Sequence, residues 1–200
     1  MRYLRKSIPI LLFITLLLPA YAYGGADNAN WKELYTDYIN DNPATEPTMS
    51  SYSLIYINDD DIPELWISFG LGFEGGALCT VWEGKLEVLR FSQGGFSYLE
   101  RQNQFAISTG RMDVYHDEIY RIQNGKFARL YKGNFGAKDN SNVQYDAAGD
   151  PIYQYFWDNK EVSQKEYESA KESVFDYSKS VSPNDNSCSA IEIIPRIKAY

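Results

Sequence analysis

Short apolar runs separated by turn residues dominate the middle of the chain, from Ser53 to about Trp157. Runs of this length that are rich in aromatic and β-branched residues predict strands, and two runs joined by a short turn predict a hairpin. Four pairs of runs fit this description: 78–82 with 86–91, 96–101 with 105–109, 119–122 with 127–131, and 153–157 with 161–162. Because the connections are too short for crossover helices, consecutive strands are expected to pair antiparallel as a meander.

An amphipathic helix is predicted before this β-rich region. Asn30 stands at the N-cap position, and Glu33 follows three residues later, as in a capping box. The apolar positions recur with the spacing of one helix face: Trp31, Leu34, Tyr35, Tyr38 and Ile39. The chain therefore enters the β-rich region from a helix that has one face to bury.

A second helix is predicted after the last hairpin. Ser163 and Glu166 form a capping box, and an apolar stripe follows at Tyr167, Ala170, Val174 and Tyr177. The final segment, 190–200, is apolar but contains Pro195. A kinked helix and an edge strand are both compatible with that pattern.

The first 22 residues have the pattern of a cleavable export signal. A basic start is followed by an apolar run at 8–18, by Pro19 and by the small-residue sequence Ala-Tyr-Ala at 20–22. This order predicts cleavage before Tyr23. An uncleaved membrane anchor is the alternative, but a spanning helix needs about 20 apolar residues, more than this run has. The protein is therefore expected to be secreted, or periplasmic in a Gram-negative host, without a stable membrane anchor.

Removal of the signal leaves residues 23–200, which are enough for one domain with a core of its own. The elements above predict an α+β fold for this domain: an antiparallel β-meander sheet packed with an N-terminal and a C-terminal helix. The chain has 19 Lys and Arg, and three of them lie in the signal, so 16 face 27 Asp and Glu in the domain. A net charge of about −11 excludes nucleic acid and anionic lipid as electrostatic partners, because both require clustered positive charge.

Two cysteines, Cys79 and Cys188, leave two alternatives open. In an oxidising compartment they can form one disulfide that closes a long loop. They can also remain two unpaired thiols, since two cysteines in a chain of this size do not make a disulfide framework. Trp66, Trp82 and Trp157 pose a similar choice, because an exposed indole can stack on a sugar ring whereas a buried one packs in the core.

An acidic cluster between two apolar runs, at 54–67, is the one chemical clue in the sequence. Calcium prefers six to eight oxygen ligands, and alternate positions of a tight loop can present them. The candidate ligands are Asn58, Asp60 and Glu64, with the backbone carbonyl of Ile62 between them. A solvated acidic turn in which Glu64 caps or pairs locally is the alternative.

This segment resembles the D-x-D-x-D-G-x-x-E-L loops of dockerin-like, EF-hand-like and FG-GAP-like proteins. It is similar to the Pro-Glu-Leu variant of that loop in a family of uncharacterised secreted bacterial proteins, in which the loop follows a helix and precedes β-hairpins. The resemblance implies calcium as a cofactor. Two departures weaken the match, because Tyr56 replaces the first aspartate and Asp61 replaces the glycine of the sharp turn.

Catalytic motifs are sparse. His116 is the only histidine, so the histidine pair of an H-E-x-x-H metallohydrolase motif cannot occur. Neither G-x-S-x-G nor a P-loop is present. The sequence therefore predicts a secreted, non-catalytic module that binds an extracellular protein or glycan, with a weak or vestigial calcium loop. An extracellular hydrolase that uses Asp and Glu carboxylates is the alternative, and an inhibitor of another exported protein is a third hypothesis. The oligomeric state is left open.

Overall fold

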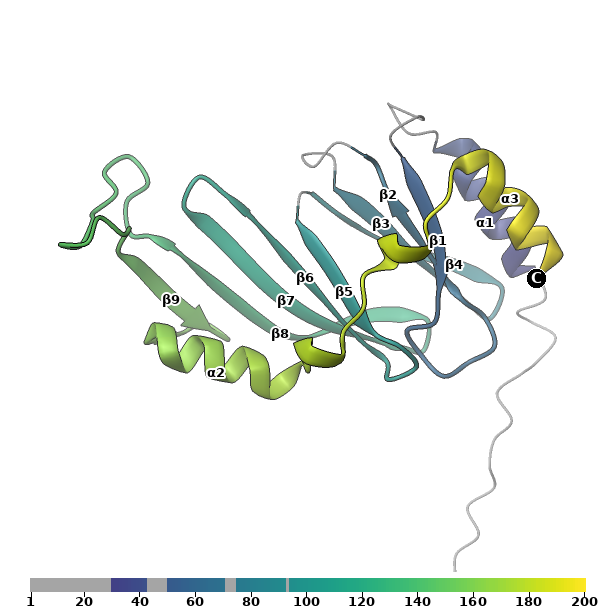
Figure 1. Cartoon of the computed structure of the whole chain (residues 1–200). Helices are drawn as coiled ribbons and strands as arrows, with labels where there is room; N and C mark the ends of the chain where they lie inside the picture. The colour runs from purple at the N-terminus through teal and green to yellow at the C-terminus, as the bar shows by residue number, and fades with distance from the viewer. Residues whose placement is uncertain (1–29, 43–49, 71–74, 93) are drawn as a thin grey trace, which may run out of the picture.

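The computed structural model describes residues 30–42, 50–70, 75–92 and 94–200, and the predicted export signal lies outside them. In this part of the chain, strands form one four-stranded and one six-stranded antiparallel sheet, and α-helices pack on the outer faces of both (Figure 1). The predicted α+β class is confirmed. The predicted meander is confirmed as well, and it is divided between two sheets.

The first sheet contains the strands that precede residue 92, in the order β1-β2-β3-β4. Their bounds are Ser51–Ile55 for β1, Glu64–Ser68 for β2, Gly76–Trp82 for β3 and Lys85–Phe91 for β4. The two central strands, β2 and β3, are buried on both faces. A sheet that is apolar on both faces needs a covering layer on each side, which explains why the remaining strands stack on it as a second sheet.

The second sheet follows the chain order from β5 to β10. Its strands are β5 Gly95–Leu99, β6 Gln104–Arg111, β7 Val114–Gln123, β8 Lys126–Ala137, β9 Tyr153–Trp157 and β10 Lys160–Val162. All four hairpins predicted from the sequence are present, including the β7–β8 hairpin at Asn124-Gly125. Strands β7 and β8 are longer than predicted. Polar side chains in the outer half of each strand interrupt the apolar pattern, so the sequence predicted only the inner halves.

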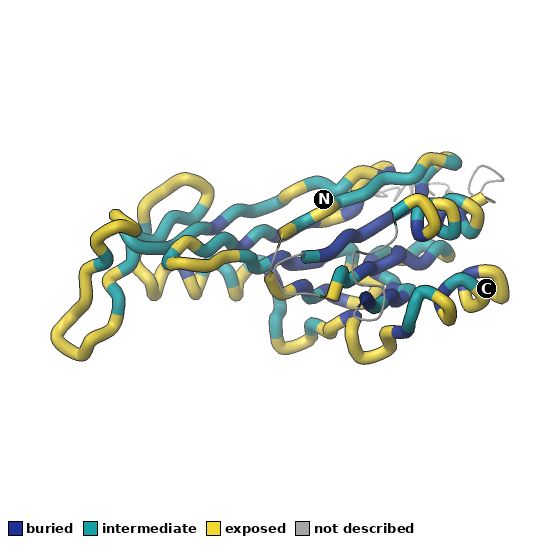
Figure 2. Tube along the Cα trace, turned by 90° about the horizontal axis from the view of Figure 1, so that it is seen from above, coloured by how far each residue is buried: buried dark blue, intermediate teal, exposed yellow. Residues whose placement is uncertain are grey.

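Aromatic side chains fill the space between the two sheets. Trp66 of β2 stacks on Phe96 of β5 with ring centroids 4.2 Å apart, and Phe96 lies 5.5 Å from Phe105. Phe105 in turn stacks on Tyr120 at 5.2 Å. Figure 2 shows that buried residues concentrate where the sheets overlap, whereas the hairpins at the far end are exposed. The inter-sheet core therefore covers only part of the six-stranded sheet.

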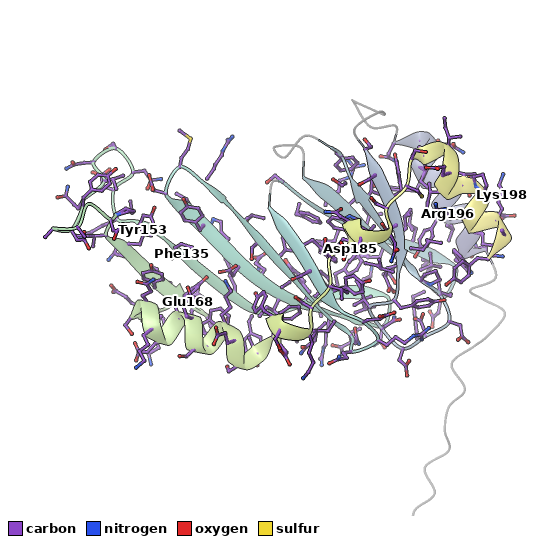
Figure 3. All side chains as sticks on the ribbon, viewed as in Figure 1. Phe135, Tyr153, Glu168, Asp185, Arg196 and Lys198 are labelled. Atoms are coloured by element: carbon purple, nitrogen blue, oxygen red, sulfur yellow. The ribbon has the colours of Figure 1, made fainter. Side chains whose placement is uncertain are left out.

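Three α-helices in the described part of the chain complete the layers. Helices α1 (Trp31–Asp41) and α3 (Ala190–Ala199) pack side by side on the outer face of the first sheet. Helix α2 (Gln164–Val174) crosses the outer face of the second sheet, close to Phe135 (Figure 3). In the described residues, no helix is long and apolar enough to cross a membrane.

The ends of the helices test the capping predictions. Ser163 and Glu166 make the predicted capping box of α2. Asn30 is the N-cap of α1, but its side chain makes no capping hydrogen bond, so the predicted box with Glu33 is wrong. The segment left undecided at 190–200 is helix α3 with Pro195 inside it, because its apolar face packs with α1 over the first sheet.

A connection between α2 and α3, residues 176–189, closes one edge of each sheet; we call it the edge strap. Val181 exchanges backbone hydrogen bonds of 2.9 and 3.2 Å with Tyr98 on β5. Cys188 exchanges bonds of 2.9 and 2.8 Å with Tyr52 on β1. Asp185 lies on this connection in Figure 3, in front of the sheets. The strap pairs backbone groups that would otherwise invite another strand to add to the sheet.

Both cysteines are buried, unpaired thiols, so the disulfide alternative is not what the structure shows. Cys188 pairs with β1, while Cys79 lies on β3. Three strand spacings of about 4.8 Å therefore separate them, roughly 14 Å in all. A disulfide requires Cα atoms within about 7 Å, so the pair cannot be bridged without rearrangement of the sheet.

We expect a thiol reagent to label two cysteines per chain in denaturant without reductant, and to label the folded protein far more slowly. Burial raises the pKa of the Cys79 thiol to about 12, so little reactive thiolate is present at neutral pH. Counting labelled thiols by mass spectrometry measures the outcome. A protein that shows no free thiol after unfolding would contradict the structure.

Candidate functional site

The calcium-like segment forms the loop between β1 and β2, and the order of strand, loop and strand is as predicted. The side chain of Asn58 accepts a hydrogen bond from the backbone N–H of Asp60 at 3.2 Å, and Asp60 accepts one from that of Ile62 at 2.9 Å. The Asn58 amide also donates to the Asp60 carboxylate at 2.7 Å. The loop is thus built from two successive Asx turns, in which side chains replace backbone partners.

Backbone contacts tie this loop to the second sheet. The N–H groups of Arg101 and Asn103, in the β5–β6 turn, donate to the carbonyls of Tyr56 and Ile57 at 2.9 and 2.6 Å. Asn103 also exchanges hydrogen bonds with the backbone of Ile122 on β7. The loop is therefore held in place by both sheets.

Glu64, the third predicted ligand, begins β2 and points into the protein. Its side chain is only 1% exposed. One carboxyl oxygen accepts a hydrogen bond from the Ile57 N–H at 2.9 Å, and the other accepts one from the Thr80 hydroxyl at 3.3 Å. Glu64 therefore joins the two ends of the loop from the inside.

The surroundings of Glu64 disfavour its charge. Burial raises the pKa of Glu64 to about 8, against the effect of the Ile57 hydrogen bond, and the nearby carboxylate of Asp60 adds to the rise. Tyr35 of α1 closes the same region, since its hydroxyl donates to the carbonyls of Pro63 and Cys79 at 3.0 and 3.2 Å. The raised pKa favours the protonated form of Glu64 in the folded protein at neutral pH.

The three predicted ligands differ in what they can offer a cation. Asn58 and Asp60 are both partly buried and lie within hydrogen-bonding distance of each other, and this burial raises the pKa of Asp60. Within the described ranges, no group of three or more His, Cys, Asp or Glu side chains is placed to hold a metal ion. Calcium at this loop would also use the Asn58 amide and the Ile62 carbonyl, and it would displace the proton of Glu64, so its affinity would rise with pH.

The three tryptophans considered for sugar stacking have different environments. Trp66 is 5% exposed in the inter-sheet core, and Trp157 stacks on Tyr131 and makes a T-shaped contact with Tyr167 of α2. These two are packing residues. Trp82, at the end of β3, is half-buried and lines an open pocket.

This pocket, which we call the Trp82 pocket, has a volume of about 460 Å³ and lies between the β3–β4 and β7–β8 hairpins. Its wall consists of Trp82, Glu83, Lys85, Leu86, Glu87, Asn124, Gly125 and Lys126. The ammonium group of Lys126 pairs with the Glu87 carboxylate at 2.5 Å, across the two sheets. The volume is within the range of small-ligand pockets, about 300–1,000 Å³.

Gly125 brings the two hairpins into contact. It occupies the second position of the β7–β8 turn with a φ of +67°, after Asn124 with a φ of +51°. A Cβ atom at Gly125 would lie 2.1 Å from the Cβ of Trp82. Glycine is therefore required both by the left-handed backbone and by the close approach of the indole.

Asp117 is a buried carboxylate that the sequence analysis did not single out. It lies on β7 and accepts hydrogen bonds from Tyr167 at 2.7 Å, from Ser108 at 2.5 Å and from the Lys171 ammonium at 3.2 Å. These partners satisfy the charge that burial would otherwise penalise. The network fixes α2 to the second sheet, which gives Asp117 a structural role.

Three further pocket residues were not predicted from the sequence: Glu87, Asn124 and Lys126. The only signal for them is the likeness of two turns, Trp-Glu-Gly-Lys at 82–85 and Gln-Asn-Gly-Lys at 123–126. That likeness predicts similar hairpins, but it does not predict that hairpins from different sheets become neighbours. The predicted loop lies at the same end of the sheets, because Glu64 is adjacent to Thr80, near the end of β3.

We expect the free energy of unfolding to fall as the pH is raised from about 5 to about 9. The pKa of Glu64 is about 8 in the folded protein and 4.5 for an exposed glutamate. The proton of Glu64 therefore stabilises the folded protein fully below a pH of about 4.5, and this stabilisation is lost above a pH of about 8. The change is on the order of a few kcal/mol. Denaturant unfolding at several pH values measures it.

The variant Glu64→Gln keeps the shape of the side chain and removes the charge, so it is expected to abolish most of this pH dependence. Glu33→Gln, which changes an exposed glutamate of α1, is the matched control and should retain it. The same pH dependence in Glu64→Gln as in the unmodified protein would rule out Glu64 as its source.

Asp60→Ala is expected to lower the unfolding temperature in EDTA as well as in millimolar calcium, because each loop hydrogen bond contributes about 1 kcal/mol. Asp59→Ala is the control, since Asp59 is exposed and its ion pair with Arg101, at 3.4 Å, adds little. Equal unfolding temperatures of Asp60→Ala and Asp59→Ala in EDTA would refute the structural role of the Asp60 hydrogen bonds. A calcium-dependent rise that Asp60→Ala loses would establish the predicted metal site.

Comparisons with protein-family models, with curated proteins and with solved structures found no match for the chain.

Proposed function

We propose that this chain is a secreted, non-catalytic binding module and that its Trp82 pocket binds an extracellular glycan. The observation that carries the proposal is the make-up of the pocket wall, where an indole, carboxylates, an amide and ammonium groups converge from two hairpins. The apolar face of a sugar ring packs on an indole, while its hydroxyls exchange hydrogen bonds with charged and amide groups.

The position of the pocket also supports binding. Trp82 and Gly125 are in contact, and Lys126 pairs with Glu87, so both hairpins hold each other in place. The hairpins extend from sheets that share the aromatic core. A wall that is ordered before the ligand arrives loses less entropy on binding than a flexible one.

Two predictions from the sequence accompany this proposal. Export through the segment 1–22 would bring the pocket to extracellular glycans or proteins, and an acidic chain does not favour nucleic acid. Calcium at Asn58, Asp60 and Glu64, with the family resemblance that implies it, remains a separate prediction. The loop and the Trp82 pocket share one end of the sheets, so calcium there would further order the binding end.

The hydrolase alternative would use the same pocket, because Glu83 and Glu87 both lie in its wall. Retaining and inverting glycosidases use two carboxylates on either side of the scissile bond. The ion pair with Lys126 engages Glu87 and favours a binding role for it. Turnover of a bound glycan that is lost in Glu87→Gln would replace the binding proposal with a hydrolase.

We expect the protein recovered from culture medium, with Tyr23 at its N-terminus, to bind members of a glycan array. Trp82→Ala should weaken this binding at least ten-fold, because it removes the stacking surface, and Lys126→Ala should weaken it several-fold. Lys160→Ala is the matched control, since Lys160 follows an equivalent turn that lies outside the pocket.

The outcome is measured as the dissociation constant of the best array ligand for each variant. Equal loss in Lys126→Ala and Lys160→Ala would argue for a general charge effect and against the pocket. Binding to a secreted protein but to no glycan, with the same dependence on Trp82, would identify a protein partner instead.

A further inference from the structure

A second pocket lies at the opposite end of the second sheet, and its wall combines polar side chains with the apolar side chains of Met112 and Val114. It has a volume of about 360 Å³ and is lined by Ser92, Thr109, Arg111, His116 and Asn140, among others; we call it the Arg111 pocket. Thr109 and His116 are paired across β6 and β7, and therefore share one face of the sheet. Strand β7 has 10 residues, which at about 3.3 Å per residue places this pocket about 30 Å from the Trp82 pocket.

Several polar side chains of this wall have no partner among the described residues. Among the described residues, the guanidinium of Arg111 and the hydroxyls of Ser92 and Thr109 have no hydrogen-bonding or ionic partner. Asn140 uses its amide N–H to bind the Met112 carbonyl at 3.2 Å, which holds the loop after β8 over the β6–β7 turn. Within the described part of the chain, the side chains of Ser92, Thr109 and Arg111 therefore keep their hydrogen-bonding capacity for a ligand.

His116 strengthens this interpretation. Its Nδ1 atom is buried, and no described residue bonds to it. A buried N–H without an acceptor is costly, so a neutral imidazole carries its proton on Nε2. His116 belongs to the same wall as the Arg111 guanidinium and the two hydroxyls.

Charge selects the kind of ligand. No aspartate or glutamate belongs to the described wall of the Arg111 pocket, although the whole chain carries a net charge of −8. The acidic residues next to the wall in sequence have donors of their own. Asp113 accepts a hydrogen bond from Tyr153 at 2.6 Å, Asp139 accepts two from Ser141, and Asp117 is bonded to Tyr167, Ser108 and Lys171. A cation among neutral donors, with no carboxylate in the described wall, favours an anionic ligand.

We propose that the Arg111 pocket binds a tetrahedral oxyanion, the sulfate or phosphate group of a ligand. Such a group presents three terminal oxygens, and the four donor side chains reach the pocket from the segment after β4 and from both strands of the β6–β7 hairpin. The guanidinium fork pairs with two of the oxygens, and the hydroxyls and the imidazole N–H serve the third. The site is independent of glycan binding at the Trp82 pocket.

The test is a titration of the purified secreted protein with inorganic sulfate, inorganic phosphate and acetate at constant ionic strength, followed by NMR of backbone amides 109–116. Saturable shifts with sulfate or phosphate are expected, with acetate binding at least several-fold more weakly. The better of the two tetrahedral ions identifies the group. Arg111→Gln should weaken binding at least ten-fold, and Thr109→Val, which keeps the shape of the side chain, should weaken it several-fold.

Arg121→Gln is the matched control, because Arg121 is an exposed arginine of the neighbouring strand β7 that bonds only to Gln123 among the described residues. It should bind as the unmodified protein does. Arg111 is exposed as well, so unchanged melting of Arg111→Gln would show that the fold is intact. The proposal is overturned by shifts no larger than those with chloride, by equal affinity for acetate, or by unaltered binding in Arg111→Gln.

Discussion

The stacking of aromatic rings between the two sheets is the interaction on which the rest of the structure depends. Trp66, Phe96, Phe105 and Tyr120 form a continuous column from β2 to β7. Strands β2 and β3 are apolar on both faces, so the first sheet would expose a large apolar surface without this contact. The Nε1 atom of Trp66 is buried with no partner among the described residues, at a cost of about 1–3 kcal/mol, which the burial of these rings offsets.

Once the sheets are stacked, their ends acquire different properties. At one end, the β1–β2 loop and the β3–β4, β5–β6 and β7–β8 turns approach one another, and hydrogen bonds from Arg101 and Asn103 to the loop connect the two sheets. At the other end, the six-stranded sheet extends past the first sheet, so that Thr109 and His116 remain on an open face. The two candidate pockets lie at these two ends and follow from the partial overlap of the sheets.

The loop of Asn58, Asp60 and Glu64 shows how far local sequence defines a candidate site. The Asx turns of Asn58 and Asp60 use partners two residues away, and such contacts follow from residue type and spacing. The burial of Glu64 depends on Thr80, 16 residues away, and on the hydroxyl of Tyr35 above it. A glutamate is usually exposed, and only the pairing of β2 with β3 turns this one inward and raises its pKa.

The sequence by itself determined the elements whose signals are local: the hairpin turns, the capping box of α2, the apolar faces of α1 and α2, and the antiparallel order of the strands. Those signals act over a few residues, through backbone geometry and side-chain periodicity. Only the tertiary structure decided the division into two sheets, the helical state of residues 190–199, the separation of Cys79 from Cys188 and the meeting of Trp82 with Gly125. These features depend on which apolar faces cover one another, and many pairings of faces bury a similar area, so residue pattern alone does not select among them.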